Sequence, residues 1–216
     1  MHGRTLTIVL ALGLLLSGLS LLRLLATVHL PGNDQGYGPR QPIAYSHRLH
    51  AGDLEIPCLY CHSGAEKSRH AGVPSASVCM NCHRFVTAPM IDVRAEERRA
   101  DAEGRKPALV VSPELRKLYD AVGFGADLRL DPTIEPRAIE WVRVHRVPDF
   151  VYFDHRPHVA AGIDCRRCHG AVEMMERVEQ QESLSMGWCL SCHRTEHQQV
   201  DGRPMSASTD CSACHY

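Results

Sequence analysis

Five copies of one short motif constrain this chain more than any other feature of its sequence. All ten cysteines lie in C-x-x-C pairs, and a histidine directly follows every pair. The motifs are Cys58-x-x-Cys61-His62, Cys79-x-x-Cys82-His83, Cys165-x-x-Cys168-His169, Cys189-x-x-Cys192-His193 and Cys211-x-x-Cys214-His215. C-x-x-C-H is the attachment signature of c-type haem: both thiols form thioethers with the porphyrin, and the histidine binds the iron. The sequence therefore predicts five haem c groups.

Cysteines in this number could instead form disulfides in an exported protein, or bind structural zinc. Neither arrangement needs a histidine next to every cysteine pair, and histidines make up only 14 of the 216 residues. The repeated C-x-x-C-H pattern therefore favours haem over both alternatives. The net charge of −1 gives no indication of a nucleic-acid partner.

The amino terminus carries a long apolar segment. The 17 residues from Leu6 to Leu22 contain no charge, and after Arg23 the apolar sequence continues to Leu30. At about 1.5 Å per residue, a helix of this length crosses the hydrocarbon core of a bilayer. Arg4 precedes the segment, which suits a cytoplasmic amino terminus. We predict that residues 1–30 are an uncleaved, single-pass anchor in the inner (cytoplasmic) membrane, with the haem region on the periplasmic side. A cleaved signal peptide is the alternative.

An internal repeat divides the part of the chain that follows the anchor. Residues 31–42 are rich in Gly, Pro and Asn and are typical of a linker. An H-x-x-H pair then precedes the first and the third attachment motifs, as His47-x-x-His50 and His155-x-x-His158. We predict a dihaem module at residues 43–90 and a trihaem module at residues 148–216, which has one additional motif at its carboxyl end.

The connecting segment, residues 91–147, has no metal-ligand pattern. Its charged part, residues 92–106, is expected to be solvated. Ser112 followed by Pro113 is typical of a helix start, because serine caps the first turn and proline has no amide hydrogen to leave unpaired there. A short helix is therefore predicted near residues 113–122.

Few segments of the exported part show a strong helix or strand period. We expect a mainly α fold with much irregular structure, built as cytochrome c3/c7-like multihaem modules with one N-terminal transmembrane helix. The number of residues per haem is too small for an ordinary core. The porphyrins should therefore supply much of the buried apolar surface.

Most irons are expected to have a second axial ligand. The strongest candidates are the four histidines of the two H-x-x-H pairs, because the pair recurs at the same place in both modules. They are His47, His50, His155 and His158. Three candidates stay open for the fifth iron, and these are His70, His145 and Met186. With the irons closed in this way, the chain is predicted to transfer electrons and to have no catalytic site of its own.

Several stretches of the sequence together resemble one known family. They are His47-x-x-His50, residues 70–74 (His-Ala-Gly-Val-Pro) before Cys79-Met-Asn-Cys82-His83, residues 147–155 (Val-Pro-Asp-Phe-Val-Tyr-Phe-Asp-His), residues 185–189 (Ser-Met-Gly-Trp-Cys) and the final Cys-His-Tyr. In them the chain is similar to the pentahaem cytochrome c subunit of bacterial alternative complex III, a quinol:electron-acceptor oxidoreductase. The resemblance covers nearly all of residues 43–216.

This resemblance implies a periplasmic electron relay within a membrane respiratory complex that oxidises quinol. The expected partners are an iron–sulfur subunit and quinol-oxidising integral membrane subunits. The expected acceptor is a monohaem cytochrome c or a terminal oxidase. On this interpretation the chain conducts electrons and forms no bonds itself.

Two other functions fit parts of the pattern. A stand-alone, membrane-anchored multihaem quinol dehydrogenase would also combine one helix with several C-x-x-C-H motifs, although five motifs and the long connecting segment fit it less well. A multihaem reductase would need one iron with an open distal face and nearby acid or base groups. The abundance of candidate distal histidines argues against the reductase.

Overall fold

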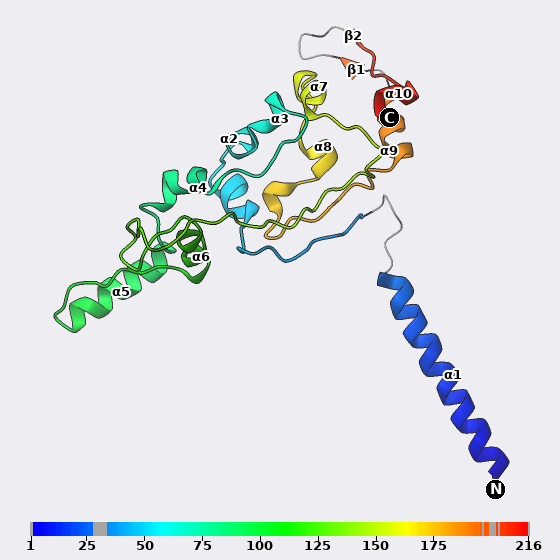
Figure 1. Cartoon of the computed structure of the whole chain (residues 1–216), viewed down its shortest axis with the longest axis horizontal. Coiled ribbons are helices and arrows are strands. Elements are labelled where there is room, and N and C mark those ends of the chain that lie inside the picture. The colour runs from blue at the N-terminus through cyan, green and yellow to red at the C-terminus, as the bar shows by residue number, and fades with distance from the viewer. Residues whose placement is uncertain (1, 28–33, 196, 199–201, 203, 216) are drawn as a thin grey trace.

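The computed structural model of the chain describes residues 2–27, 34–195, 197–198, 202 and 204–215 (Figure 1). Its elements are α1 (His2–Thr27), the π-helical η1 (Arg48–Asp53), α2 (Cys58–Cys61), α3 (Gly64–Lys67), α4 (Ala76–His83), α5 (Met90–Ala102), α6 (Pro113–Ala121), α7 (His155–Ala160), α8 (Arg166–His169), the 3-10 turn η2 (Val172–Met174), α9 (Met186–His193), β1 (His197–Gln198), β2 (Pro204–Met205) and α10 (Cys211–Cys214). The two short strands pair antiparallel. Irregular segments join most elements, so the expected mainly helical chain with much irregular structure is confirmed.

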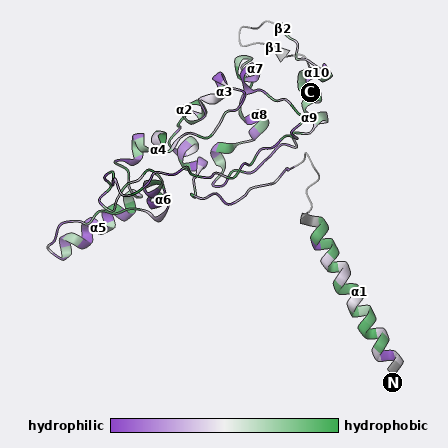
Figure 2. Ribbon diagram, in the orientation of Figure 1, coloured by the Kyte–Doolittle hydropathy of each residue, from purple (hydrophilic) through white to green (hydrophobic). Residues whose placement is uncertain are grey.

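Helix α1 is long and apolar enough to cross a membrane. Its Gly3–Leu25 part has a mean hydropathy of 2.3 and is not buried against the rest of the described chain. Figure 2 shows α1 as hydrophobic along most of its length. The hydroxyl of Ser17 donates to the carbonyl of Gly13 at 2.9 Å, so this polar group is satisfied inside the helix. Residues 28–33, where the predicted anchor meets the predicted linker, lie outside the described part.

The attachment motifs lie on short helices, as expected. Each motif has its own helix, which ends at the histidine or one residue before it; these helices are α2, α4, α8, α9 and α10. Local side chains start two of them: Ser185 accepts from the amide of Trp188 at 3.3 Å, and Asp210 accepts from the amide of Ser212 at 2.9 Å. One helical turn places the two cysteines of a motif, three residues apart, on the same side of the helix.

Helices α4, α5 and α6 form a lobe at one end of the haem-motif region (Figure 1). The core of this lobe is Met80, Leu118 and Tyr119, whose exposed fractions are 6 %, 3 % and 0 %. The hydroxyl of Tyr119 donates to the carbonyl of His83 at 2.6 Å. The lobe therefore contains the second attachment motif, and this hydrogen bond joins α6 to the end of α4.

Helix α6 begins and ends as the sequence predicts. The side chain of Ser112 accepts from the amide of Leu115 at 3.3 Å, with Pro113 in the first turn. After the last turn the chain reverses at Gly123, whose φ is +81° and where an added Cβ would lie 2.9 Å from the carbonyl oxygen of Ile134. Glycine is required there because residues with a side chain rarely adopt a positive φ.

The charged segment 92–106, expected to be solvated, is mostly helix α5. Within this helix Glu96 and Ala100 are buried, with exposed fractions of 8 % and 0 %. The Glu96 carboxylate accepts from the guanidinium of Arg105 at 2.5 Å and from the amide of Ala108 at 2.9 Å. An inward-facing carboxylate replaces the apolar stripe that normally identifies a packed helix, which is why the sequence pattern missed it.

The apolar core of the protein is small. Among the described residues, the buried hydrophobic side chains are Ala65, Met80, Ala88, Ala100, Leu118, Tyr119 and Ala121. Most of these belong to the α4–α6 lobe or its flanks, and four of them are alanines. The region that carries the other attachment motifs must therefore be stabilised by something besides its own side chains.

We predict that Tyr119→Phe lowers the free energy of unfolding by about 1–2 kcal/mol, because it removes the hydrogen bond from the buried Tyr119 to the carbonyl of His83. The measurement is guanidinium denaturation of the haem-loaded chain, followed by circular dichroism. Tyr60→Phe is the matched control, since the exposed Tyr60 hydroxyl accepts only from the exposed side chain of Asn81. Tyr60→Phe should lower the free energy of unfolding by less than about 0.5 kcal/mol. Equal losses in both variants would contradict the packing described for the lobe.

A second prediction concerns acid stability. The hydrogen bond from Arg105, followed by that from Ala108, lowers the pKa of Glu96 from 4.5 to about 2. A carboxyl with a lowered pKa stabilises the fold above its unfolded value and loses that contribution as the pH falls. Glu96→Gln should therefore reduce stability at pH 7 and flatten its pH dependence between 4.5 and 2. Denaturant titrations across this range test it, with exposed Glu97→Gln as the control that keeps the parent profile.

Candidate metal centres

Four of the attachment histidines each have a second imidazole at a nearly constant distance. The ring centroids are 6.4 Å apart for His47 and His62, 6.1 Å for His50 and His83, 6.3 Å for His155 and His169, and 6.0 Å for His158 and His193. Two imidazoles that bind one metal ion through nitrogens at about 2.0 Å place their centroids roughly 6 Å apart. Each pair is therefore spaced so that one iron fits between its two rings.

The angles between the paired rings follow the same order in both modules. The first histidine of each H-x-x-H pair is almost parallel to its partner, at 6° for His47 and 7° for His155. The second is tilted, at 58° for His50 and 39° for His158. The repeat in the sequence is therefore also a repeat in the geometry of the sites.

Most of the paired imidazoles hold their Nδ1 atom in a hydrogen bond to backbone. The acceptors are the carbonyls of Ser46 for His50, Gly72 for His62, Val86 for His83, Arg69 for His155, Asp154 for His158 and Ser208 for His193, at 2.6–2.9 Å. A carbonyl can only accept, so the proton of each neutral ring is on Nδ1. The lone pair is then on Nε2, which is the atom left to bind a metal.

An aromatic residue orients both histidines of each H-x-x-H pair. Tyr45 and Phe153 lie two residues before the first histidine, and each contacts its ring edge-on at a centroid distance of 4.8 Å. The same aromatic ring also packs against the second histidine, at 4.4 Å and 4.9 Å. The residue that follows the aromatic, Ser46 or Asp154, accepts from the second histidine. This packing accounts for the aromatic residue at the same place in both copies of the repeat.

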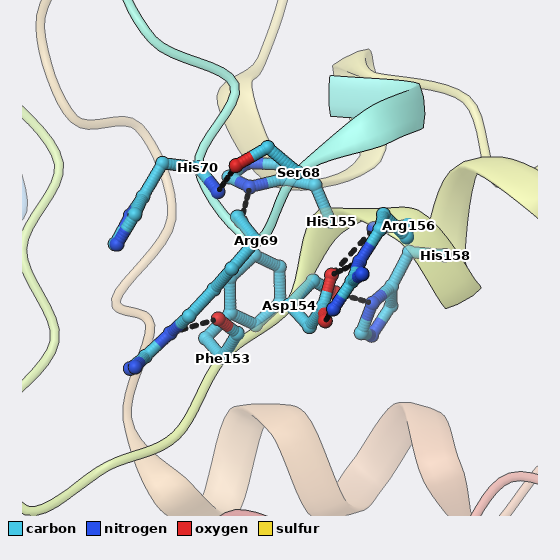
Figure 3. Close-up of polar contacts among 8 residues, drawn as sticks. All are labelled: Ser68, Arg69, His70, Phe153, Asp154, His155, Arg156 and His158. Carbon is cyan, nitrogen blue, oxygen red and sulfur yellow. Dashed lines mark hydrogen bonds and ion pairs between the residues drawn. The ribbon is translucent and has the colours of Figure 1, made fainter. Parts of the chain in front are cut away.

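Arg69, which follows the first motif, contacts the residues that precede the third motif (Figure 3). Its carbonyl accepts from both the Nδ1 atom and the amide of His155, at 2.9 Å and 3.2 Å. Its guanidinium donates to the carbonyl of Phe153 at 2.9 Å and lies 4.2 Å from the ring centroid of Tyr152. A residue shortly after the first motif thus orients an imidazole that precedes the third motif.

Burial keeps several of these imidazoles neutral. Burial, followed by the nearby His62, lowers the pKa of His47 to about 4. Burial, followed by His145, lowers the pKa of His169 to about 3. The neutral form is the one with a free nitrogen lone pair, so at ordinary pH these rings are in the state that binds a metal.

The attachment motifs follow one another in space in an order that differs from their order in the sequence. Burial is the largest cause of the raised pKa of several thiols, and the thiol of an adjacent motif adds to it. These neighbours are Cys61 with Cys82, Cys58 with Cys165, Cys168 with Cys192, and Cys189 with Cys214. The spatial order is therefore second, first, third, fourth and fifth motif.

The fifth motif is held by residues 150–152, which precede the second H-x-x-H pair. The amide of Tyr152 donates to the carbonyl of Cys214 at 2.7 Å, and Val151 pairs with His215 as an isolated β-bridge. The ring of Phe150 lies 5.8 Å from that of His215. Among the described residues, the ring that lies near His215 is that of Phe150, whereas each of the other four attachment histidines faces a histidine of an H-x-x-H pair.

The three candidates for the fifth distal ligand have different surroundings. His70 is exposed and points away from His155 in Figure 3. His145 lies against His169, with its Nε2 atom 3.3 Å from the Nδ1 atom of that ring. Met186 is 64 % exposed and opens α9, one turn before Cys189.

The surroundings of the motifs fit haem. Side chains that flank them are exposed although they are apolar: Leu54 is 59 % exposed, Phe85 80 % and Met186 64 %. A porphyrin is a large apolar ring, and bound at these motifs it would cover such side chains. Imidazole pairs at a metal-bridging distance, paired thiols beside them and uncovered apolar side chains together match a c-type haem better than zinc.

Comparisons with known proteins point the same way. Residues 151–216 match the profile of cytochrome c7 and related cytochrome c. This chain carries a cytochrome c7-like multihaem domain. It is a multihaem cytochrome c that binds haem iron and transfers electrons. Its amino-terminal helix is long and apolar enough for a membrane anchor or a signal segment.

Two proteins of Nitratidesulfovibrio vulgaris are similar to this cytochrome. One is the multiheme cytochrome c subunit of menaquinone reductase, 25 % identical over 196 residues, covering 81 % of this chain and 76 % of that protein. The other is the high-molecular-weight cytochrome c, 23 % identical over 184 residues, covering 73 % of this chain and 29 % of that longer protein. The likeness to both extends well beyond the matched carboxyl-terminal third.

We predict that His47→Ala and His155→Ala each convert one six-coordinate, low-spin iron into a high-spin iron. The reason is that each removes the ring opposite an attachment histidine. Low-temperature electron paramagnetic resonance (EPR) of the oxidised protein, with spin quantification, gives the measurement. His70→Ala is the control. Its EPR spectrum should equal that of the parent protein, because the ring of His70 belongs to none of the four pairs. A high-spin signal in the control, or none in the other two variants, would contradict the assignment.

Proposed function

We propose that this chain carries five haem c groups and works as the electron relay of a membrane quinone/quinol oxidoreductase complex. The observation that carries the proposal is the set of four imidazole pairs at 6.0–6.4 Å. Haem supplies the reversible one-electron change of its iron when it is bound. The paired rings leave that iron no open position for a substrate, which favours conduction over catalysis.

We assign the axial ligands by these pairs. His47 lies opposite His62 of the first motif, His50 opposite His83 of the second, His155 opposite His169 of the third, and His158 opposite His193 of the fourth. The cysteines of the same four motifs, and Cys211 and Cys214 of the fifth, form the thioethers. The two histidines of each H-x-x-H pair thus serve two different haems and hold neighbouring sites together.

For the fifth iron, opposite His215, we propose Met186 as the distal ligand. Cys189 is next to Cys214, and Met186 lies three residues before Cys189 on α9, so both project from the same side of the helix. Met186 is exposed, as a ligand is expected to be before a ring covers it. The other two candidates are less suitable, because His70 is exposed away from the paired rings and His145 contacts the Nδ1 side of His169.

Met186→His and Met186→Leu test this ligand. The oxidised parent protein should show the near-infrared absorption of a methionine-ligated haem, and both variants should lose it. Met186→His should keep all irons low-spin and lower one midpoint potential, since methionine raises the potential relative to histidine. Met186→Leu should give one high-spin iron. An unchanged near-infrared spectrum in both variants would rule out Met186.

The spatial order of the motifs suggests the path of the electrons through the chain and the two ends of that path. The array runs from the second motif, on α4 in the α4–α6 lobe, through the first and third motifs to the fourth and fifth. The amide of Gly36 donates to the carbonyl of Gln180 at 2.7 Å, shortly before α9. Gly36 lies nine positions after Thr27, the last residue of α1, so Gly36 is within about 30 Å of the end of that helix. We propose that the fourth and fifth haems exchange electrons with the membrane subunits, and the second haem with the distant partner.

The complex proposed here is of the alternative complex III type, with the haem region on the periplasmic side of the inner membrane. Its other subunits would be an iron–sulfur protein and quinol-oxidising integral membrane proteins. A monohaem cytochrome c or a terminal oxidase would accept the electrons. The residues quoted from the sequence, the single apolar helix and the similarity to a multihaem subunit of a quinone-linked enzyme support this assignment.

A second candidate reverses the direction of electron flow. The relative named as a subunit of menaquinone reductase works on the same type of membrane carrier in the opposite sense. In that case the second haem would accept electrons from a soluble donor, and the fourth and fifth haems would pass them to quinone-reducing membrane subunits.

Gentle detergent purification of the native complex, followed by identification of its subunits, tests the proposal. Integral membrane subunits and an iron–sulfur protein should co-purify with this chain. Added quinol should then reduce its haems if the complex oxidises quinol. A soluble reduced cytochrome should reduce added menaquinone if the direction is reversed. A lone homodimer that oxidises quinol would contradict both and would favour the stand-alone quinol dehydrogenase.

A further inference from the structure

The first and third attachment sites are equivalent in the repeat but differ in what contacts the back of their attachment histidine. In the first site the Nδ1 atom of His62 lies 2.6 Å from the carbonyl oxygen of Gly72. In the third site the Nδ1 atom of His169 lies 3.3 Å from the Nε2 atom of His145. The two rings meet edge to face, at a centroid distance of 4.4 Å and an angle of 81°. A side chain has taken the place that backbone occupies in the equivalent site.

The chemistry of the site settles which nitrogen carries the proton. A neutral histidine that binds iron through Nε2 keeps its proton on Nδ1, so His169 donates and His145 accepts. His145 must then hold its own proton on Nδ1.

An imidazole nitrogen is a more basic acceptor than an amide carbonyl oxygen. A proximal histidine that donates to a stronger acceptor gains electron density, and through its Nε2 atom it stabilises the oxidised iron. We infer that His145 is a positioning residue that orients His169 and lowers the reduction potential of the third haem relative to the equivalent first haem. This inference rests on the proposed assignment of His155 and His169 to one iron.

The position of the third site in the array makes this difference in reduction potential relevant to electron transfer. Cys165 of the third motif neighbours Cys58 of the first, and Arg69 reaches across the same junction to hold His155. The third site is therefore where electrons cross between the dihaem and trihaem modules. A potential set by a side chain at this crossing can differ from that of the first site, whose partner is backbone.

Two variants of nearly equal size separate the proposed role from a purely structural one. His145→Leu removes the acceptor, whereas His145→Gln can still accept through its amide oxygen. The measurements are a spectroelectrochemical titration of the haem-loaded chain and EPR of its oxidised form. In His145→Leu, one midpoint potential should move to a more positive value and the others should stay. The EPR feature that changes should be the one lost in His155→Ala.

His145→Gln should keep the parent potential, or move it less than the leucine variant does, in the same direction. Arg146→Gln, at an exposed neighbouring position, is the control and should leave every potential in place. Equal shifts in the leucine and glutamine variants would overturn the inference, as would no shift in either. A new high-spin iron in both would also overturn it, because it would make His145 an axial ligand. If these variants behave as expected but the His155→Ala feature is a different one, the proposed ligand assignment fails and not the role of His145.

Discussion

The distance of about 6 Å between the ring centroids of paired imidazoles is the constraint on which the rest of this structure depends. The side chains of the chain bury a small apolar core, and much of that lies in the α4–α6 lobe. Elsewhere the order of the fold rests on hydrogen bonds that aim ring nitrogens at one another across a space of metal-bridging width. Short helices and irregular segments are sufficient for that purpose, because each needs only to deliver a histidine or a cysteine pair to the edge of the gap.

The internal repeat explains both the regularity of the array and the place where it changes. Each copy of the repeat has an aromatic residue, two histidines three positions apart and a backbone acceptor for the second histidine. Together they produce the same local geometry around Tyr45 and Phe153. The change comes at the third motif, where Arg69 and His145 supply contacts that have no counterpart in the first. These contacts lie where the two copies of the repeat meet.

The sequence predicted what is local and missed what depends on distant residues. The motif helices, the cap at Ser112 and the apolar helix α1 follow from neighbouring residues and are confirmed. Helix α5 was missed because its buried face carries Glu96, whose partners come from the following loop. The contact of His145 with His169 could not be predicted, because it brings together residues 24 positions apart through irregular backbone.

The same limit applies to the candidate ligands. The sequence predicted the four histidines as candidate ligands because the H-x-x-H pair recurs before the first and the third motif. The attachment histidine that each one faces depends on how the modules pack, and no period in the sequence contains that information. The two copies nevertheless show one scheme, in which the first histidine faces the next motif and the second faces the motif after it.

Low-temperature EPR of the fully oxidised, haem-loaded protein tests the pairing most directly, because the signal of a low-spin haem depends on the angle between its two axial imidazoles. The four pairs predict two low-spin irons with nearly parallel rings and two with tilted rings, which have a larger spread of g values. With Met186 in place, the fifth iron should also be low-spin. High-spin signals from two or more irons would contradict the account.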